Sequence, residues 1–295
     1  LSYISNMLEL SALEKIIADQ RQNFIAKDAG TPREIDFAKY LKTNQITVIS
    51  GIRRSGKSTL LKQFSAYFSD YYYFTFDDER LINFQVEDFA TLMLAFAKIS
   101  PARTIFLDEI QNVAGWERFA RRLYEEGYKI FITGSNAKLL CSELATHLTG
   151  RYFKIDLYPF SFREFLAFNK VSPEDKTTAG EALALKNFDD YLRHGGFPEY
   201  LKFDNAQILQ ELLNDILIRD IAVRYNIRSI KTLKEMALYL ITNVGKEFSF
   251  NFLKKTFDLG STNTVIDFVS YFEDSYLLFT IQKFDYSLKK QLVNP

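Results

Sequence analysis

The sequence predicts an α/β fold in which helices flank a parallel β-sheet, followed by a helical lid and a small third domain. One indication is the apolar, β-branched stretch at 46–50, which leads through a turn into the helical pattern of residues 59–68. A second is the pair of short apolar stretches at 102–110 and 128–132. A third is the change to helical patterns from Phe188 onwards. Strands that alternate with helices are typical of a parallel sheet.

Residues 51–58 read Gly-Ile-Arg-Arg-Ser-Gly-Lys-Ser, a complete G-x-x-x-x-G-K-S phosphate-binding loop (Walker A) between strand and helix. The glycines let the backbone wrap around oxygen atoms with its N–H groups pointing inward. Lys57 can reach the β and γ oxygens of a triphosphate, and the Ser58 hydroxyl can ligate Mg²⁺. The alternative is a glycine-rich turn before a helix. We expect ATP to be held by Gly51, Ile52, Arg53, Arg54, Ser55, Gly56, Lys57, Ser58 and Thr59.

Two adjacent acids close the stretch at 102–110, in the form of a Walker B segment. Asp108 would hold magnesium through its water shell, and Glu109 would orient or deprotonate the attacking water. Two acids at a strand end are also common in solvated turns. The presence of the phosphate-binding loop favours the catalytic interpretation, and a carboxylate at Glu109 favours hydrolysis over transfer to another substrate.

The strand at 128–132 is followed by Thr133-Gly134-Ser135-Asn136. A polar side chain here can hydrogen-bond the γ-phosphate or the water, the sensor 1 role in AAA+ ATPases. Thr133 and Ser135 are the candidates, with Asn136 behind them. The alternative is an N-cap, since Ser135 or Asn136 would begin the helix predicted at 137–148. Both roles stay open.

Arg151 precedes the alternating strand at 153–157. AAA+ proteins tend to present an arginine finger at this point, and such a finger can increase the rate by about a thousandfold or more. Arg151 could supply it to a neighbouring subunit. A surface arginine paired with an acid is the alternative.

By these motifs the chain resembles the prokaryotic AAA+ ATPases that have an AAA_14-type P-loop domain and a DUF4143 C-terminal region. The resemblance spans nearly the whole chain. Its more specific signatures are Pro-Phe-Ser-Phe-Arg-Glu-Phe, within residues 158–166, and Gly-Gly-Phe-Pro, within 194–201. The resemblance implies a P-loop NTPase fold of the AAA+ type. It also implies that Pro198 lines the adenine pocket, since related lids carry a Gly-x-Pro element there. A rigid turn between helices is the alternative.

Length and composition agree with a soluble, multidomain enzyme. The chain has 295 residues, 28 Phe and 17 Tyr, which is ample material for more than one core. Lys+Arg and Asp+Glu are balanced at 37 each, so no overall field attracts nucleic acid or membrane. The single cysteine, Cys141, fits a reducing cytoplasm. No unbroken apolar run reaches the ~20 residues of a membrane span. With only His147, His194 and Cys141 available, we expect no His/Cys metal site.

Three domains are expected. Residues 1–168 would form the ATPase domain with an N-terminal helix at 8–25, and residues 169–228 the helical lid. Residues 229–295 look like a winged helix, with helices at 232–243, 250–257 and 262–274 and a strand at 277–284. The chain starts at Leu1 rather than Met and stops shortly after that strand, so we expect a fragment. Members of the family that it resembles commonly continue into a further domain.

DNA binding is weakly supported. Winged helices often bind DNA through the third helix, but residues 262–274 contain Asp267, Glu273 and Asp274 with no Lys or Arg. Phosphate contacts need several basic groups on one face, so this helix favours a packing or protein-contact role. Arg53 and Arg54 are more simply explained by charge balance beside a triphosphate.

Three function classes follow. The first is an AAA+ ATPase that couples Mg-ATP hydrolysis to movement of the lid and winged helix, acting as a homo-oligomer with Arg151 in trans. The second is a nucleotide-loaded switch with little turnover, which Glu109 disfavours. The third is a DNA-transaction ATPase, whose binding would fall steeply with salt. The protein partner is not readable from the sequence.

Overall fold

The computed structural model describes residues 8–134, 148, 150–281, 284 and 286. The chain divides into two compact units, residues 1–204 and 205–295, and each is described by itself. The helical lid predicted at 169–228 therefore spans the boundary between the units. Ser135 and Asn136, with nearly all of the helix predicted at 137–148, lie outside the described residues.

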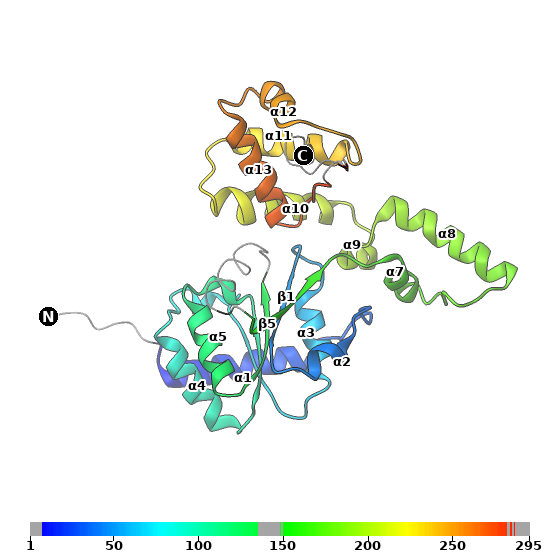
Figure 1. The fold of residues 1–295 in the computed structure, drawn as a ribbon. Helices are drawn as coiled ribbons and strands as arrows, with labels where there is room; N and C mark the ends of the chain where they lie inside the picture. Colours follow the sequence, from blue (N-terminus) through cyan, green and yellow to red (C-terminus); the bar gives the residue numbers. More distant parts are fainter. Residues whose placement is uncertain (1–7, 135–147, 149, 282–283, 285, 287–295) are drawn as a thin grey trace. The chain divides into compact units, whose positions relative to one another are not determined.

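A five-stranded parallel sheet forms the centre of the first unit, with strand order β2-β3-β4-β1-β5 (Figure 1). The strands are β1 (Ile46–Gly51), β2 (Tyr72–Thr75), β3 (Thr104–Asp108), β4 (Lys129–Gly134) and β5 (Tyr152–Leu157). This confirms the predicted α/β fold with its parallel sheet. Because all strands run in one direction, Gly51, Asp108 and Gly134 end their strands at the same edge of the sheet.

Helices cover both faces of this sheet. The described helices of the unit are α1 (Leu10–Ala26), α2 (Phe37–Leu41), α3 (Lys57–Ser65), α4 (Asp88–Ile99), α5 (Trp116–Glu125), α7 (Phe162–Phe168), α8 (Thr178–His194) and α9 (Pro198–Phe203), with 3₁₀ turns η1 (Glu79–Leu81) and η2 (Ile110–Asn112). Along β3, Ile105 and Leu107 belong to the core under α1, α4 and α5, while Phe106 belongs to the core under α3. A strand buried on both faces needs a continuous apolar run, which explains the sequence pattern.

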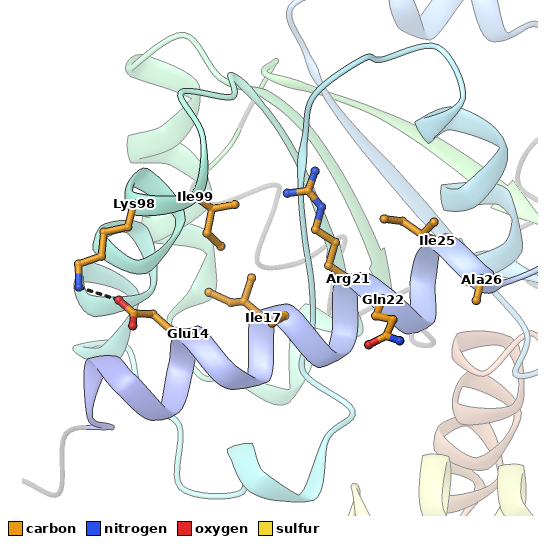
Figure 2. A pocket seen from close by; sticks show the side chains of 9 residues that line it. Glu14, Ile17, Arg21, Gln22, Ile25, Ala26, Lys98 and Ile99 are labelled. Carbon is orange, nitrogen blue, oxygen red and sulfur yellow. Dashed lines mark hydrogen bonds and ion pairs between the residues drawn. The ribbon is translucent and has the colours of Figure 1, made fainter.

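Helix α1 closes the β2 edge of the sheet. The Gln20 side-chain amide donates to the Thr75 carbonyl at 3.0 Å and accepts from the Thr75 N–H at 2.9 Å. These bonds satisfy backbone groups that an edge strand would otherwise expose. Figure 2 shows an open groove beside this helix, lined by Ile17 and Ile25 of α1 and by Ile99 of α4. The Lys98–Glu14 ion pair, at 2.6 Å, bounds the groove at one end.

The second unit is helical in its described part. It consists of α10 (Gln207–Asp215), the π-helix η3 (Ile216–Val223), α11 (Ile230–Thr242), α12 (Phe250–Thr256) and α13 (Thr262–Asp274). The last three lie where helices were predicted. Ser249 and Ser261 cap α12 and α13 by accepting from the N–H groups of Phe252 and Thr264. Leu233, Met236, Leu253, Val265 and Phe272 are fully buried in this unit.

The strand predicted at 277–284 is wrong for its described part, because residues 277–281 form neither helix nor strand. A strand needs a partner for its backbone groups, and no strand occurs among the described residues of 205–281. The Thr280 N–H instead donates to the Glu273 carboxylate at 2.9 Å. The described residues thus form helices where three were predicted, and the winged helix itself stays a prediction.

Candidate phosphate-binding and catalytic site

The phosphate-binding loop joins β1 to α3 at the carboxyl edge of the sheet. Gly56 has φ 97°, in the left-handed region, and is the N-cap of α3. No side chain caps this helix among the described residues. The first N–H groups of any α-helix point out of its N-terminus and can donate to groups outside the helix. These donors, together with the positive end of the helix dipole, suit an anion.

The two glycines of the motif are required for different structural reasons. A Cβ on Gly51 would lie 2.0 Å from the Leu157 carbonyl oxygen of the neighbouring strand β5. Gly56 instead needs a backbone conformation that L side chains rarely adopt. The sequence motif attributes both positions to phosphate, whereas Gly51 also lets β1 and β5 pair closely.

Lys57 is buried, with 6% of its surface exposed. Its ammonium donates to the carbonyls of Gly51 at 3.1 Å and Ile52 at 3.2 Å. The same nitrogen lies 4.0 Å from the Glu109 Oε1 atom. The Walker A lysine and the Walker B glutamate therefore lie beside one another, as the sequence motifs require.

Thr133 connects the two acids. Thr133 is fully buried, with 0% of its surface exposed. Its hydroxyl donates to Asp108 Oδ1 and accepts from the Glu109 backbone N–H at 2.9 Å. Asp108 is the last residue of β3, and Glu109 follows in the left-handed region with φ 53°. This backbone turn directs the two neighbouring carboxylates into different surroundings.

The surroundings of the Glu109 carboxylate make it more basic than an ordinary glutamate. Burial raises its pKa above the usual value, the Lys57 ammonium opposes that rise, and the Asp108 carboxylate adds to it. Gln111 donates to Glu109 Oε2 from the turn that follows. A carboxylate whose pKa is raised is a stronger base than an ordinary one, which suits a general base.

Tyr73 is a site residue that the motifs do not reveal. It lies on β2, next to β3, and its hydroxyl donates to Asp108 Oδ2 at 3.3 Å. Burial and the adjacent Asp108 carboxylate raise the pKa of Tyr73, so it stays a donor. Its ring stacks on Phe24 of α1 at 3.8 Å between centroids. The only sequence signal is its place in an apolar, aromatic stretch at residues 71–76.

Arg33 is a second site residue that no sequence motif indicates. Its guanidinium is buried against the phosphate-binding loop and donates to the Ser55 carbonyl at 2.8 Å. It forms a buried ion pair with Glu164 of α7 at 2.8 Å between Nε and Oε1. No motif covers an isolated arginine in the segment between α1 and α2.

The segment of Pro198 approaches the phosphate-binding loop at Arg54. Arg54 has φ 61° and forms a partly exposed ion pair with Glu199 at 3.2 Å. Pro198 is the first residue of α9, directly before Glu199. The structure thus brings the segment of Pro198 to the nucleotide loop within the first unit.

Arg151 lies at the amino edge of the sheet, where the parallel strands begin. It directly precedes β5, and its carbonyl accepts from the Ile46 N–H at 2.8 Å, where β1 begins. Its side chain is 4.0 Å from Glu125. The carboxyl edge carries the phosphate-binding loop, so Arg151 does not reach the site of its own chain. This placement agrees with either predicted role, a finger in trans or a surface ion pair.

Comparison with known proteins places the chain among archaeal and bacterial relatives. It is 36% identical over 299 residues to the uncharacterized protein MJ1544 of Methanocaldococcus jannaschii, covering 97% of this chain and 67% of the relative. The chain belongs to the MJ1544 family. An uncharacterized protein of Haemophilus influenzae is 33% identical over 265 residues, covering 84% of this chain and 64% of its own length. The chain thus spans about two thirds of the length of these relatives.

Two domain families match this MJ1544-family chain. Residues 43–166 match the AAA domain family, which covers the phosphate-binding loop, both acids and Thr133. Residues 185–294 match a domain of unknown function, DUF8612. The prediction of a DUF4143 region is therefore wrong, because the C-terminal part of the chain matches DUF8612 instead.

A solved structure shares the fold of the MJ1544-family chain. The Walker-type ATPase PABY2304 of Pyrococcus abyssi matches with a TM-score of 0.51 at 15% identity, covering 84% of this chain and 93% of that chain. At this identity the likeness concerns the fold alone. With the strand order and the AAA domain match, it identifies the first unit as a P-loop NTPase fold of the AAA+ type. None of the helices described here is both long and apolar enough to span a bilayer.

Proposed function

We propose that this MJ1544-family chain binds Mg-ATP and hydrolyses it to ADP and phosphate. The observation that carries the proposal is the cluster at the carboxyl edge of the sheet, where Lys57 lies 4.0 Å from Glu109 and Thr133 bonds both acids. Nucleotide binding alone would need the loop and the lysine. The partly exposed Glu109 carboxylate, with its raised pKa, adds a group that can activate water.

The residues present fit the phosphates of ATP. The uncapped first turn of α3 offers N–H donors, and Lys57 offers a positive charge. The Ser55 hydroxyl is buried and has no hydrogen-bond partner among the described residues, so a phosphate oxygen would satisfy it. Gly51, Ile52, Arg53, Arg54, Gly56 and Thr59 complete the proposed loop contacts. We place the adenine against Pro198.

Ser58 and Asp108 would hold Mg²⁺, the latter through water. The ion would neutralise charge on the phosphates. In this proposal Glu109 accepts a proton from a water molecule, and the water oxygen forms a bond to the γ-phosphorus. The bond from that phosphorus to the bridging oxygen breaks, and the electron pair leaves with ADP. Lys57 stabilises the negative charge that develops on the transferred group.

Thr133 would act as the sensor, because its hydroxyl bonds the backbone of Glu109 and the side chain of Asp108. Ser135 stays a prediction as its neighbour. Arg151 would complete the site of a second copy, which its location at the opposite edge from its own loop supports. The proposed output is movement of the lid, residues 169–228, and of the C-terminal helices. A cytoplasmic location likewise stays a prediction.

Steady-state ATP hydrolysis over a range of protein concentrations tests the proposal. Lys57→Ala should abolish nucleotide binding, and Glu109→Gln should bind ATP but lower turnover by about 10²–10⁴-fold. Lys62→Ala is a matched control, since Lys62 lies on the same helix and donates to the Ile25 carbonyl. Wild-type turnover that rises with concentration supports a site completed in trans. Tight binding of ATP without turnover at any concentration would replace hydrolysis by a nucleotide switch.

A further inference from the structure

Arg33 makes three directed contacts from a buried position. It is 8% exposed. Its Nη1 donates to the Ser55 carbonyl at 2.8 Å, and its Nη2 donates to the Tyr158 carbonyl at 2.7 Å. Its Nε donates to Glu164 Oε1 at 2.8 Å. A planar guanidinium can serve three acceptors in fixed directions, which an ammonium cannot do.

The counter-ion of Arg33 is itself held in place. Glu164 is 6% exposed, and its Oε1 also accepts from the Glu34 N–H at 2.7 Å. Its Oε2 accepts from the Ser161 N–H at 2.9 Å, while the Ser161 hydroxyl accepts from the Glu164 N–H at 3.2 Å. This capping box fixes the carboxylate at the first turn of α7. Arg33 is therefore anchored to a rigid helix end.

The contact with Ser55 has a consequence for the phosphate-binding loop. The peptide group between Ser55 and Gly56 is planar and trans, so its C=O and N–H point in opposite directions. Because Arg33 holds the Ser55 carbonyl, the Gly56 N–H points away from Arg33. Gly56 is the N-cap of α3, where the donors for an anion lie.

We propose that Arg33 is a positioning residue that sets the orientation of the Ser55–Gly56 peptide and so preforms the phosphate-binding loop. It acts through the backbone and does not touch the nucleotide. The inference rests on the proposed function for its nucleotide readout. It also assigns a role to the signature at 158–166, since Tyr158 and Glu164 hold the other two sides of the guanidinium.

Arg33→Lys tests the proposal, because lysine keeps the charge beside Glu164 but has one nitrogen and cannot reach all three acceptors. Two measurements are made on the whole chain: hydrogen exchange of peptides covering residues 51–60, and the affinity for a fluorescent ADP analogue with Mg²⁺. Arg163→Lys is the matched control. Arg163 lies on α7 beside Glu164, is 74% exposed at its side chain, and pairs with Glu34 at 3.3 Å.

Arg33→Lys should accelerate hydrogen exchange in peptides from 51–60 and leave exchange in peptides from β3 and β4 unchanged. It should also lower the affinity for the ADP analogue by about tenfold or more. Arg163→Lys should change neither measurement. Unchanged exchange at 51–60 in Arg33→Lys overturns the proposal, as does faster exchange spread evenly over the sheet, which marks a role in general stability. If Arg33→Lys unfolds, Glu164→Gln, which weakens the anchor, replaces it with the same expectations. A wild type that binds no nucleotide refutes the proposed function, while the exchange comparison still decides the role of Arg33.

Discussion

The hydroxyl of Thr133 accepts a hydrogen bond from the backbone N–H of Glu109 at 2.9 Å, and it donates its own proton to Asp108. Thr133 lies near the end of β4 and Asp108 ends β3, the neighbouring strand. One side chain thus holds together the two acids to which we assign magnesium binding and water activation. The orientation of Glu109 depends on a residue 24 positions away in sequence.

We predict that Thr133→Val lowers the free energy of unfolding by about 1–3 kcal/mol, because it leaves buried groups of Asp108 and Glu109 without a partner. Turnover should fall by about 10–100-fold with little change in nucleotide affinity. Thr47→Val is the control: Thr47 lies on β1 of the same sheet, and its buried hydroxyl has no hydrogen-bond partner among the described residues. Urea denaturation and turnover of both variants check this. Equal effects at the two positions would contradict it.

Glu109→Gln should make the nucleotide-free protein more stable at neutral pH. The pKa of Glu109 is raised in the folded state, chiefly by burial, so the folded chain binds this proton more tightly than the unfolded chain. That stabilising contribution is present below the unfolded pKa and is lost as the pH rises through the folded pKa. Glutamine should therefore be favoured above the raised pKa, with the difference disappearing in acid. Urea denaturation of both proteins across pH measures this, and a wild type that is more stable at neutral pH would refute it.

Gly51→Ala should lower the free energy of unfolding by about 3 kcal/mol or more, because the added methyl group meets backbone atoms of β5 that cannot move aside. Its Cβ would lie 2.0 Å from the Leu157 oxygen. Gly127→Ala is the comparison, with φ 81° and no atom within 4 Å of an added Cβ. There only backbone strain acts, costing about 1–2 kcal/mol. Unfolding followed by Trp116, which is 1% exposed, reports both. Similar losses would show that β1 and β5 can separate.

Arg151→Ala should lower turnover by about a thousandfold if it acts as a finger, with nucleotide affinity unchanged. Arg122→Ala, which removes the surface pair with Glu126 at 3.1 Å, should have no effect. A mixture of Arg151→Ala and Glu109→Gln chains should regain activity, since one chain offers an intact site and the other an intact arginine. Full turnover of Arg151→Ala by itself would assign Arg151 to its pair with Glu125.

Local patterns predicted most of the fold. The strands at 46–50 and 128–132 and the helices at 250–257 and 262–274 lie within about one or two residues of their predicted ends. These elements have strong apolar patterns and clear caps. The prediction of a strand at 277–284 was wrong for its described part, because a strand also needs a partner that its own sequence does not contain. The π-helix at 216–223 gave no signal of its own, since its apolar residues resemble those of an α-helix.

The sequence by itself determined the parts of the site that lie on contiguous motifs: the loop at 51–58, the acids Asp108 and Glu109, and Thr133 at a strand end. Their spacing is a property of local backbone geometry, so it can be recognised without the fold. Only the tertiary structure decided that Tyr73 donates to Asp108 and that Arg33 holds the Ser55 carbonyl. Both contacts join segments distant in sequence, and each depends on which strands and helices pack together, which no local pattern encodes.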